Sequence, residues 1–426
     1  MWSYRSSAGE ILPWSAGIFR DLLVALRRAD PESEAQELFA VGAPGVVRWT
    51  SALEGDGRDV LVAHDRVMAW VGTGDVVAFD ARSGAHRWAW SHPMPLSRGD
   101  EAYLAPLSAG RIVAVRSCWL DRTEMFTAVL DEHGQRTFSA SCRIGTLHVS
   151  GSVSASPVTD AQRVFHGASR PEDTEPAFTG LLSAIQADPP KVLWARSVYR
   201  DMIPVALHLL SPEHLVVRLI GGRSGNRHTH EGVCVVDASS GTTRWGCAWE
   251  RPTSPATTAH DDIAVSAHFL AFVSSVAGSV SEVQVFHPAD HNPIWTVKIP
   301  PHQARLIVSG KRAFAAHTTG MVALDLASGR SVWQCHLEPP VWNSARLGEV
   351  VAVAAGASLH GICARTGAIL WSVPEIPDLE HACLLAGNGH FFVIGPHEVH
   401  AIPRKGPGVR CLSSAERVAP RVGLGD

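Results

Sequence analysis

The sequence predicts an all-β fold, an eight-bladed β-propeller of four-stranded antiparallel blades. Two observations support this prediction. An Asp-x-x-Ser-Gly-x-x-x-Trp signature recurs along the chain, and its copies lie about one blade length apart. Its three clearest copies run from Asp80 to Trp88, from Asp237 to Trp245 and from Asp325 to Trp333.

Each part of the signature has a structural reason. An apolar, often β-branched run precedes the Asp, as a buried strand requires. The Asp side chain can accept hydrogen bonds from amides two residues on, and the Gly can adopt the positive φ that closes a tight turn. The Trp then lies on the next strand, where a large ring can fill the space between neighbouring sheets. One unit therefore predicts a β-hairpin with an aromatic packing residue.

The weaker copies extend the series to eight. An aromatic residue four positions after a turn recurs at intervals of 38 to 56 residues, at Trp49, Trp88, Phe138, Trp194, Trp245, Trp295, Trp333 and Trp371. The turn residues that we assign to the repeat are Asp80, Gly84, Asp237, Gly241, Asp325, Gly329 and Gly367. Two further short strands precede each hairpin, which gives four strands per period.

The two ends of the series predict how the ring closes. After Trp371 the chain offers three strand-like segments, 380–385, 389–394 and 398–402, without a fourth. The unmatched fourth strand is 45–50, which carries Trp49. We therefore expect this strand to close the last blade, so that no open sheet edge remains. The propeller would span 45–403, with an N-terminal extension at 1–44 and a partly flexible tail at 404–426.

The N-terminal extension predicts one or two short helices. Phe19, Leu22, Leu23 and Leu26 form an apolar stripe at helical spacing. Asp30 and Pro31 are typical of the start of a second helix that would end near residue 38. The stripe could pack on the propeller itself or insert into a groove on a partner protein.

The repeat resembles that of the pyrroloquinoline-quinone-enzyme-like eight-bladed propellers, which read apolar-Ala-x-Asp-x-x-Thr/Ser-Gly-x-x-x-Trp. The segments 152–160 and 164–167 are similar to the first two strands of that repeat. The resemblance covers about 45–403 and implies the fold. It leaves two kinds of function open, because the superfamily contains quinone-dependent dehydrogenases and non-catalytic scaffolds such as the outer-membrane assembly lipoprotein propellers.

Composition indicates a globular protein without an affinity for polyanions. Hydrophobic residues make up 46% of the chain, charged residues make up 18%, and the formal net charge is −4. This charge gives no electrostatic reason to expect nucleic acid or an anionic membrane as a partner. No apolar segment is long enough to span a membrane, so we expect no membrane insertion.

The remaining composition favours a bacterial cytoplasmic protein. The first residues lack the pattern of a signal peptide. The eight cysteines are scattered, without CxxC pairs, as expected of reduced thiols in the cytoplasm. Only four lysines occur beside many arginines, a bias typical of a GC-rich bacterial genome.

Catalytic constellations are missing from the sequence. The resemblance implies that a quinone-dependent dehydrogenase would carry two adjacent cysteines and calcium ligands, and no two cysteines are adjacent here. The pair Asp261-Asp262 is interpreted as a solvated turn. The histidine groups, His228 with His230 and His390 with His397 and His400, are interpreted as ordinary strand or loop residues. We expect no cofactor, no metal and no enzymatic activity.

Loop lengths predict where partners bind. The links between the second and third strands are expanded in blades two, three and four, at 117–124, 167–180 and 221–232. Such links emerge on one face of a propeller, so three neighbours would form a continuous docking ridge. Trp119 is the best anchor candidate, and the other candidate contacts are Arg122, Arg170, Glu172 and Arg223.

These observations predict a non-catalytic, cytoplasmic scaffold, a propeller subunit of a larger bacterial assembly. Protein partners would bind the loops of blades two to four and, in one interpretation, the N-terminal helix. Two alternatives remain: a sensor propeller that binds a small molecule or metal in its channel, and a quinone-dependent dehydrogenase.

Overall fold

The structure is a computed structural model of the whole chain. It describes residues 1–406, apart from 8, 31–34, 73, 93–100, 118–123, 144–154, 161, 172–177, 188, 201, 225–226, 251–262, 267, 277–279 and 303–305.

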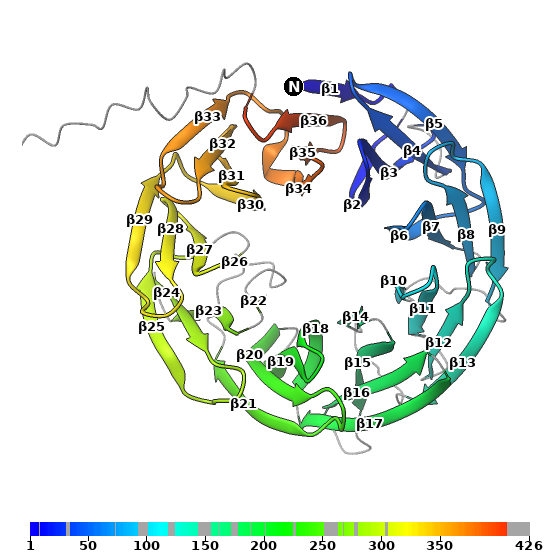
Figure 1. Cartoon of the computed structure of the whole chain (residues 1–426), viewed down its shortest axis with the longest axis horizontal. Coiled ribbons are helices and arrows are strands. Elements are labelled where there is room, and N and C mark those ends of the chain that lie inside the picture. The colour runs from blue at the N-terminus through cyan, green and yellow to red at the C-terminus, as the bar shows by residue number, and fades with distance from the viewer. Residues whose placement is uncertain are drawn as a thin grey trace, which may run out of the picture.

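The described strands form a closed ring of nine four-stranded antiparallel sheets (Figure 1). Blade 1 contains β2 (Ile11–Phe19), β3 (Leu22–Arg28), β4 (Gln36–Gly42) and β5 (Val46–Ala52). Blade 2 contains β6 (Gly57–Ala63), β7 (Arg66–Val71), β8 (Asp75–Asp80) and β9 (His86–Ser91). Blade 3 contains β10 (Glu101–Pro106), β11 (Ile112–Ser117), β12 (Glu124–Leu130) and β13 (Arg136–Arg143).

The same order repeats in the next three blades. Blade 4 contains β14 (Ala155–Thr159), β15 (Arg163–Pro171), β16 (Phe178–Ala187) and β17 (Pro190–Arg200). Blade 5 contains β18 (Met202–Ser211), β19 (His214–Ser224), β20 (Arg227–Asp237) and β21 (Thr243–Glu250). Blade 6 contains β22 (Ile263–Val265), β23 (Leu270–Val276), β24 (Val280–Phe286) and β25 (Pro293–Ile299).

The last three blades complete the ring. Blade 7 contains β26 (Ile307–Ser309), β27 (Arg312–His317), β28 (Gly320–Asp325) and β29 (Ser331–His336). Blade 8 contains β30 (Val341–Leu347), β31 (Val350–Ala355), β32 (Ser358–Cys363) and β33 (Ile369–Val373). Blade 9 contains β34 (Cys383–Gly387), β35 (His390–Ile394), β36 (Glu398–Pro403) and the N-terminal strand β1 (Trp2–Arg5).

Ring closure follows the predicted principle with a different strand. Strand β1 pairs with β36, with Trp2 opposite Ala401 and Arg5 opposite Glu398. The predicted closing strand, 45–50, instead belongs to β5, the outer strand of a complete blade 1. The prediction of eight blades is therefore wrong by one.

The predicted helical extension is also wrong. The described residues contain no α-helix, and their one helical element is a 3-10 turn, η1 (Leu379–His381). The stripe that indicated a helix spans β2, a tight turn at Arg20 and β3. Leu22 and Leu26 face blade 2, whereas Leu23 faces blade 9. Because β3 is buried on both faces, its apolar residues run consecutively and imitate a helical stripe. The second predicted helix is replaced by β4, and 31–34 lie outside the described residues.

The core is divided among the contacts between blades. Each pair of neighbouring blades encloses its own buried apolar cluster in the described chain, as between blades 7 and 8, where Phe314, Met321 and Trp333 pack against Val351 and Val353. No single central core holds the ring together. Burial at the contacts between blades stabilises it instead.

The repeat tryptophans connect each blade to the next. Trp194 of blade 4 donates its indole N–H to the Ala238 carbonyl in the turn of blade 5, at 3.1 Å. Its ring covers Gly241, where an added Cβ would lie 2.6 Å from the indole and where φ is +73°. Only glycine meets both conditions. Indole bonds to the next blade recur at Trp49, Trp88, Trp245, Trp295, Trp333 and Trp371.

Phe138 occupies the same repeat position without an indole donor. It packs in the cluster between blades 3 and 4. Trp2 is the ninth member of the series, which the sequence reading missed. Its ring lies 3.6 Å from where a Cβ on Gly45 would be.

Arginines add a second connection between blades that sequence reasoning also missed. Arg66 and Arg163 stand at the first residue of β7 and β15. Arg66 donates to the Glu132 carbonyl at 2.8 Å, and Arg163 donates to the Ala238 carbonyl at 3.3 Å. These carbonyls also accept the indole bonds of Trp88 and Trp194. The sequence signal was an arginine at the first position of each of these second strands.

Candidate interaction surface

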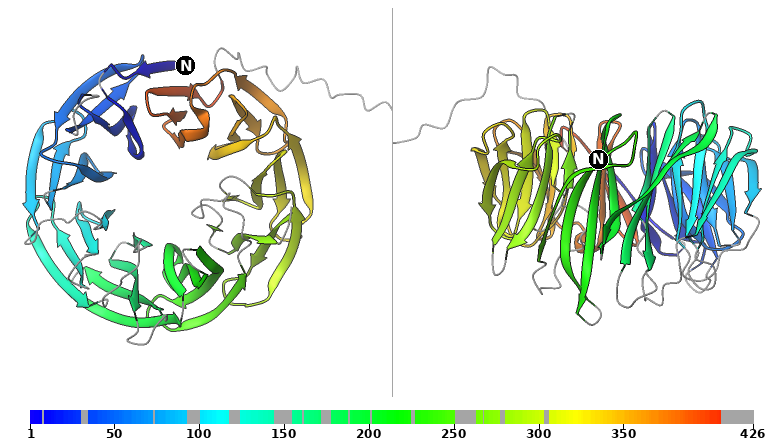
Figure 2. Two further views of the ribbon diagram at one scale, coloured as in Figure 1. Left: turned by 180° about the vertical axis from the view of Figure 1, so that it is seen from behind. Right: turned by 90° about the horizontal axis from the view of Figure 1, so that it is seen from below.

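The hairpins between the second and third strands of blades 4 and 5 are longer than their counterparts. Strands β15 and β16 have 9 and 10 residues, and β19 and β20 have 11 each. The corresponding strands of blade 7, β27 and β28, have 6 each. The extra length carries the green strands beyond the neighbouring blades on one face of the ring (Figure 2, right).

The long links are mostly strand, although the sequence predicted loops. In blade 5 the ladder continues through Gly221 opposite His230 to Ser224 opposite Arg227, beside residues 225–226, which lie outside the described chain. In blade 4 it continues to Pro171 opposite Phe178. Gly221 and Gly222 lie within β19. Glycine weakens a strand but does not end a ladder whose partner strand is already in register.

Because β2 to β5 form an additional blade at the start of the chain, each predicted blade number increases by one. The three expanded links predicted for blades two to four belong to blades 3 to 5. Since every blade repeats the same antiparallel strand order, its link between second and third strands emerges on the same face. The prediction that these links share a face agrees with this topology. The blade 3 link, 118–123, lies outside the described residues.

A buried ion pair lies at the base of the blade 5 hairpin. Arg218 on β19 and Glu231 on β20 place a guanidinium nitrogen 3.6 Å from a carboxylate oxygen, with side-chain exposures of 3% and 9%. Both side chains are shielded from water, so removing one partner would leave the other charge buried and unpaired. The pair thus disfavours a slipped register at the point where the hairpin leaves the ring.

The base of the blade 4 hairpin is polar as well. His166 on β15 stands opposite Ser183 on β16, and both are buried. Burial lowers the pKa of His166 to about 3, so its imidazole is neutral at physiological pH. Both long hairpins therefore begin from polar buried residues in the interior of the ring.

Several predicted contact residues cannot be placed. Trp119, Arg122 and Glu172 lie outside the described residues. The backbone of Arg170 is in β15, opposite Thr179, and that of Arg223 is in β19, opposite His228. The structure therefore assigns Arg170 and Arg223 to the two long hairpins.

Of the two roles considered for the N-terminal candidates, the structure supports packing within the propeller. Leu22, Leu23 and Leu26 are buried between blades, and Phe19 packs partly buried against the same cluster as Leu22. Leu22, Leu23 and Leu26 therefore stabilise blade 1 and are not accessible to a partner, whereas Phe19 is partly exposed.

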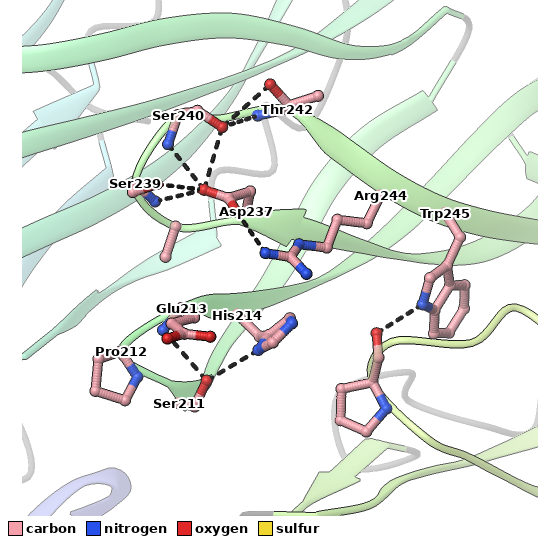
Figure 3. A network of polar contacts seen from close by, with 12 residues as sticks. Ser211, Pro212, Glu213, His214, Asp237, Ser239, Ser240, Thr242, Arg244 and Trp245 are labelled. Carbon is pink, nitrogen blue, oxygen red and sulfur yellow. Dashed lines mark hydrogen bonds and ion pairs between the residues drawn. The ribbon is translucent and has the colours of Figure 1, made fainter.

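Two of the turn aspartates of the repeat have displaced pKa values. Asp237 accepts the amides of Ser239 and Ser240 at 3.0 Å each, and Arg244 donates to it at 2.6 Å (Figure 3). The hydrogen bonds from Ser239 and Arg244 hold the pKa of Asp237 well below its usual range. Asp80, with Ser83 and Arg87, is in the same situation.

Metal ligands are not gathered among the described residues. No three side chains of His, Cys, Asp or Glu lie together there in a way that could hold an ion. His400 contacts Glu398 at 3.1 Å, and His390 contacts the Asn388 carbonyl. The pair Asp261-Asp262 lies outside the described chain. The described residues also contain no helix that is long and apolar enough to cross a membrane.

Comparison with known families extends these observations. The model of the family described as outer membrane protein assembly factor BamB matches residues 22–210 and 279–389, more than half of the chain. The chain belongs to this family. The match begins inside blade 1, in agreement with strands well before residue 45, and the predicted quinoprotein-like repeat is confirmed.

Solved structures of the same kind include proteins of different function. BamB from Moraxella catarrhalis is 15% identical, with 94% of this chain and 98% of that chain covered and a TM-score of 0.48. A europium-containing methanol dehydrogenase is 11% identical, with 92% and 83% covered and a TM-score of 0.50. Sqt1 from Saccharomyces cerevisiae is 10% identical, with 95% and 98% covered and a TM-score of 0.48.

The likeness to the methanol dehydrogenase shows a shared fold and says nothing about activity. A comparison with curated protein sequences found no match.

Proposed function

We propose that this protein is a non-catalytic interaction scaffold, a propeller subunit of a larger bacterial assembly. Its partners would bind the face from which the hairpins of blades 4 and 5 project. The observation that carries the proposal is the length of these hairpins, whose strands have 9 to 11 residues where those of blade 7 have 6.

The ring itself does not need the extra length. The short hairpin of blade 7 closes its blade with 6-residue strands, and its apolar clusters are as complete as those around the long blades. An extension beyond the ring costs backbone entropy without adding to those cores. Binding residues are found disproportionately on projections held by a rigid scaffold. Membership of the BamB family is compatible with this role.

Trimming the hairpin of blade 5 tests the proposal. Ile220 and Glu231 stand directly opposite each other, so replacing Gly221–His230 by Asn-Gly should close the shortened hairpin with a two-residue turn. We expect the tagged protein to co-purify from its native cells with a stoichiometric partner, and the trimmed variant to lose that partner while keeping its thermal midpoint. A full-length protein that runs alone would contradict the proposal.

We also propose the cytoplasm as the compartment. Four of the described cysteines are free thiols, Cys234, Cys247, Cys335 and Cys363, in keeping with a reducing environment. Cell fractionation with compartment markers tests this proposal. Recovery of the protein outside the cytoplasmic fraction would contradict it.

A further inference from the structure

One position of the repeat connects neighbouring blades through an arginine. It lies opposite the turn residue in the ladder between the second and third strands, as Arg66 lies opposite Asp80. From there the guanidinium reaches a carbonyl in the turn of the next blade, as Arg66 reaches that of Glu132 at 2.8 Å. Four arginines in blades 2, 3, 4 and 7 donate in this way, Arg66, Arg111, Arg163 and Arg312.

Blade 5 has a histidine at this position. His214 is the first residue of β19 and stands opposite Asp237 in the ladder. Its Nδ1 atom lies 3.0 Å from the Ser211 hydroxyl (Figure 3). Its Nε2 atom is buried and has no hydrogen-bond partner among the described residues. In blade 6 the Pro288 carbonyl accepts the indole N–H of Trp245 at 2.8 Å, and no arginine of the described chain donates to it.

Other blades that lack the arginine place an apolar side chain there. Leu22 in blade 1 lies opposite Gly42, Val350 in blade 8 lies opposite Cys363, and both are buried. An apolar side chain has no polar atom to satisfy, whereas a buried nitrogen without a hydrogen bond costs free energy. The histidine therefore makes the contact between blades 5 and 6 less favourable than either alternative.

The charges around His214 do not compensate for its burial. Glu213 precedes it in the turn, Asp237 ends β20, Arg244 lies on β21, and His287 follows β24 of blade 6. Burial lowers the pKa of His214, and Arg244 and His287 lower it further, while Glu213 and Asp237 act in the opposite direction. The net effect is a lowered pKa, so the imidazole is neutral at physiological pH.

We propose that the contact between blades 5 and 6 is a pH-sensitive joint of the ring, which loosens when His214 is protonated. The cation would carry an N–H group at Nε2 that is buried without an acceptor in the described chain. Because the folded ring disfavours the cation, the joint keeps its full stability above the ordinary pKa of histidine, about 6.5, and loses stability as the pH falls below it.

This inference concerns the ring and holds whether or not the hairpins bind a partner. If the proposed scaffold function is right, the joint also adds a form of regulation. Strand β19 carries both His214 and one side of the long hairpin, so loosening at its first residue would reach the docking surface.

Hydrogen exchange of the purified full chain tests the joint blade by blade. Exchange of backbone amides is followed by mass spectrometry at pH 7.5 and pH 5.5 and corrected for the intrinsic rates at each pH. We expect protection in β19 and β23, on the two sides of the joint, to fall by about threefold or more at pH 5.5. Protection in β27 and β31, where Arg312 supports the contact, should change by less than about twofold.

Two substitutions of His214 remove its titration. H214Q keeps a polar side chain that does not titrate in this pH range, and H214R introduces the side chain that blades 2, 4 and 7 use. We expect each variant to abolish the loss of protection at pH 5.5. The matched control is H291Q, because His291 is an exposed histidine in the turn of blade 6. This control should lose protection as the unmodified protein does.

Three results would overturn the proposal. One is equal protection of β19 and β23 at the two pH values in the unmodified protein, and another is an unchanged loss in both H214Q and H214R. The third is greater protection at pH 5.5, since the cation would then strengthen the contact, as an arginine does. The scaffold function is tested separately by the trimmed hairpin at pH 7.5, so the failure of one proposal does not decide the other.

Discussion

Cys363 shows how one side chain can take over a role in the repeat. It stands where other blades place the turn aspartate, five positions before Ala368 and four before Gly367, and its amide and carbonyl close the same turn. Burial alone would raise the pKa of its thiol, but hydrogen bonds from Thr366 and from the amides of Thr366 and Arg365 outweigh burial and lower it. The thiolate thus receives the contacts that Asp237 receives in blade 5.

This environment predicts a reactive thiol. Because the pKa of Cys363 is lowered, more of it is thiolate at pH 8, whereas burial raises the pKa of Cys247 to about 11. We expect iodoacetamide to label Cys363 at a lower pH than Cys247, as read by mass spectrometry across a pH series. Faster labelling of Cys247 would contradict the assignment. The variant C363D should keep the turn and its thermal midpoint.

The shared carbonyl between blades 7 and 8 predicts non-additive energetics. Ala364 accepts the indole N–H of Trp333 at 3.0 Å and the guanidinium of Arg312. Removing one donor leaves the carbonyl satisfied by the other, so W333F and R312M should each cost about 1 kcal/mol. The double variant should cost more than the sum, because the carbonyl is then unsatisfied. Urea denaturation measures the free energy of unfolding of each variant. If the losses of the two single variants add up to the loss of the double variant, the predicted coupling is wrong.

At the scale of elements, β1 is a four-residue strand with a large structural role. Arg5 forms an ion pair with Glu398. Arg27 of blade 1 contacts Tyr4 on β1 and also Glu37 within its own blade. Trp2 packs against Phe392 with ring centroids 6.2 Å apart. Backbone pairing, Arg5 and Trp2 thus hold the strand within blade 9, and Tyr4 connects it to Arg27 of blade 1.

Removing β1 should open the ring. Deleting residues 1–6 exposes the edge of β36, and an uncovered strand edge favours pairing between molecules. We expect a lower thermal midpoint and self-association by size-exclusion chromatography with light scattering. The variant Y4F keeps the strand and loses only the hydroxyl. It should keep the oligomeric state of the full chain and lower the thermal midpoint only slightly. If the truncated protein has the same thermal midpoint and the same oligomeric state as the full chain, β1 does not have this closing role.

The sequence predicted elements well where burial was one-sided. The Asp-Gly turns and the outer strands with their tryptophans appear where the repeat placed them, because turn chemistry is local. Strand β3 was predicted as a helix, because burial on both faces removes the alternation that marks a strand. The blade 5 hairpin was predicted as a loop, because its ladder depends on a partner strand and not on the local glycines.

At the scale of the whole molecule, the fold class followed from the repeat and the blade count did not. A count based on aromatic spacing stops where the chain stops, and Trp2 has no turn before it in sequence. Its turn is at the other end of the chain, where Gly406 lies against Trp371 and the Trp371 indole bonds to the Arg404 carbonyl. Only closure in space joins the two halves of that blade.

The interaction surface that we propose could be predicted from the sequence only in part, for a similar reason. Unequal link lengths are visible in sequence, and the long hairpins of blades 4 and 5 lie where two of the three expanded links were predicted. The buried Arg218–Glu231 pair at the base of the blade 5 hairpin could not be predicted from the sequence, because the pairing depends on which face of the sheet each residue occupies. The asymmetry of the ring, with long hairpins on two neighbouring blades, is the basis of the scaffold function that we propose.

Site-specific photo-crosslinking in living cells tests the scaffold function most directly. A benzophenone amino acid would be placed at Thr179 and Thr229 on the two hairpins, and at Ser328, exposed in a turn at the other end of blade 7. We predict ultraviolet-dependent crosslinks to one recurrent protein from Thr179 and Thr229 and none from Ser328. Crosslinks from Ser328 alone, or none from either hairpin, would contradict a docking surface on blades 4 and 5.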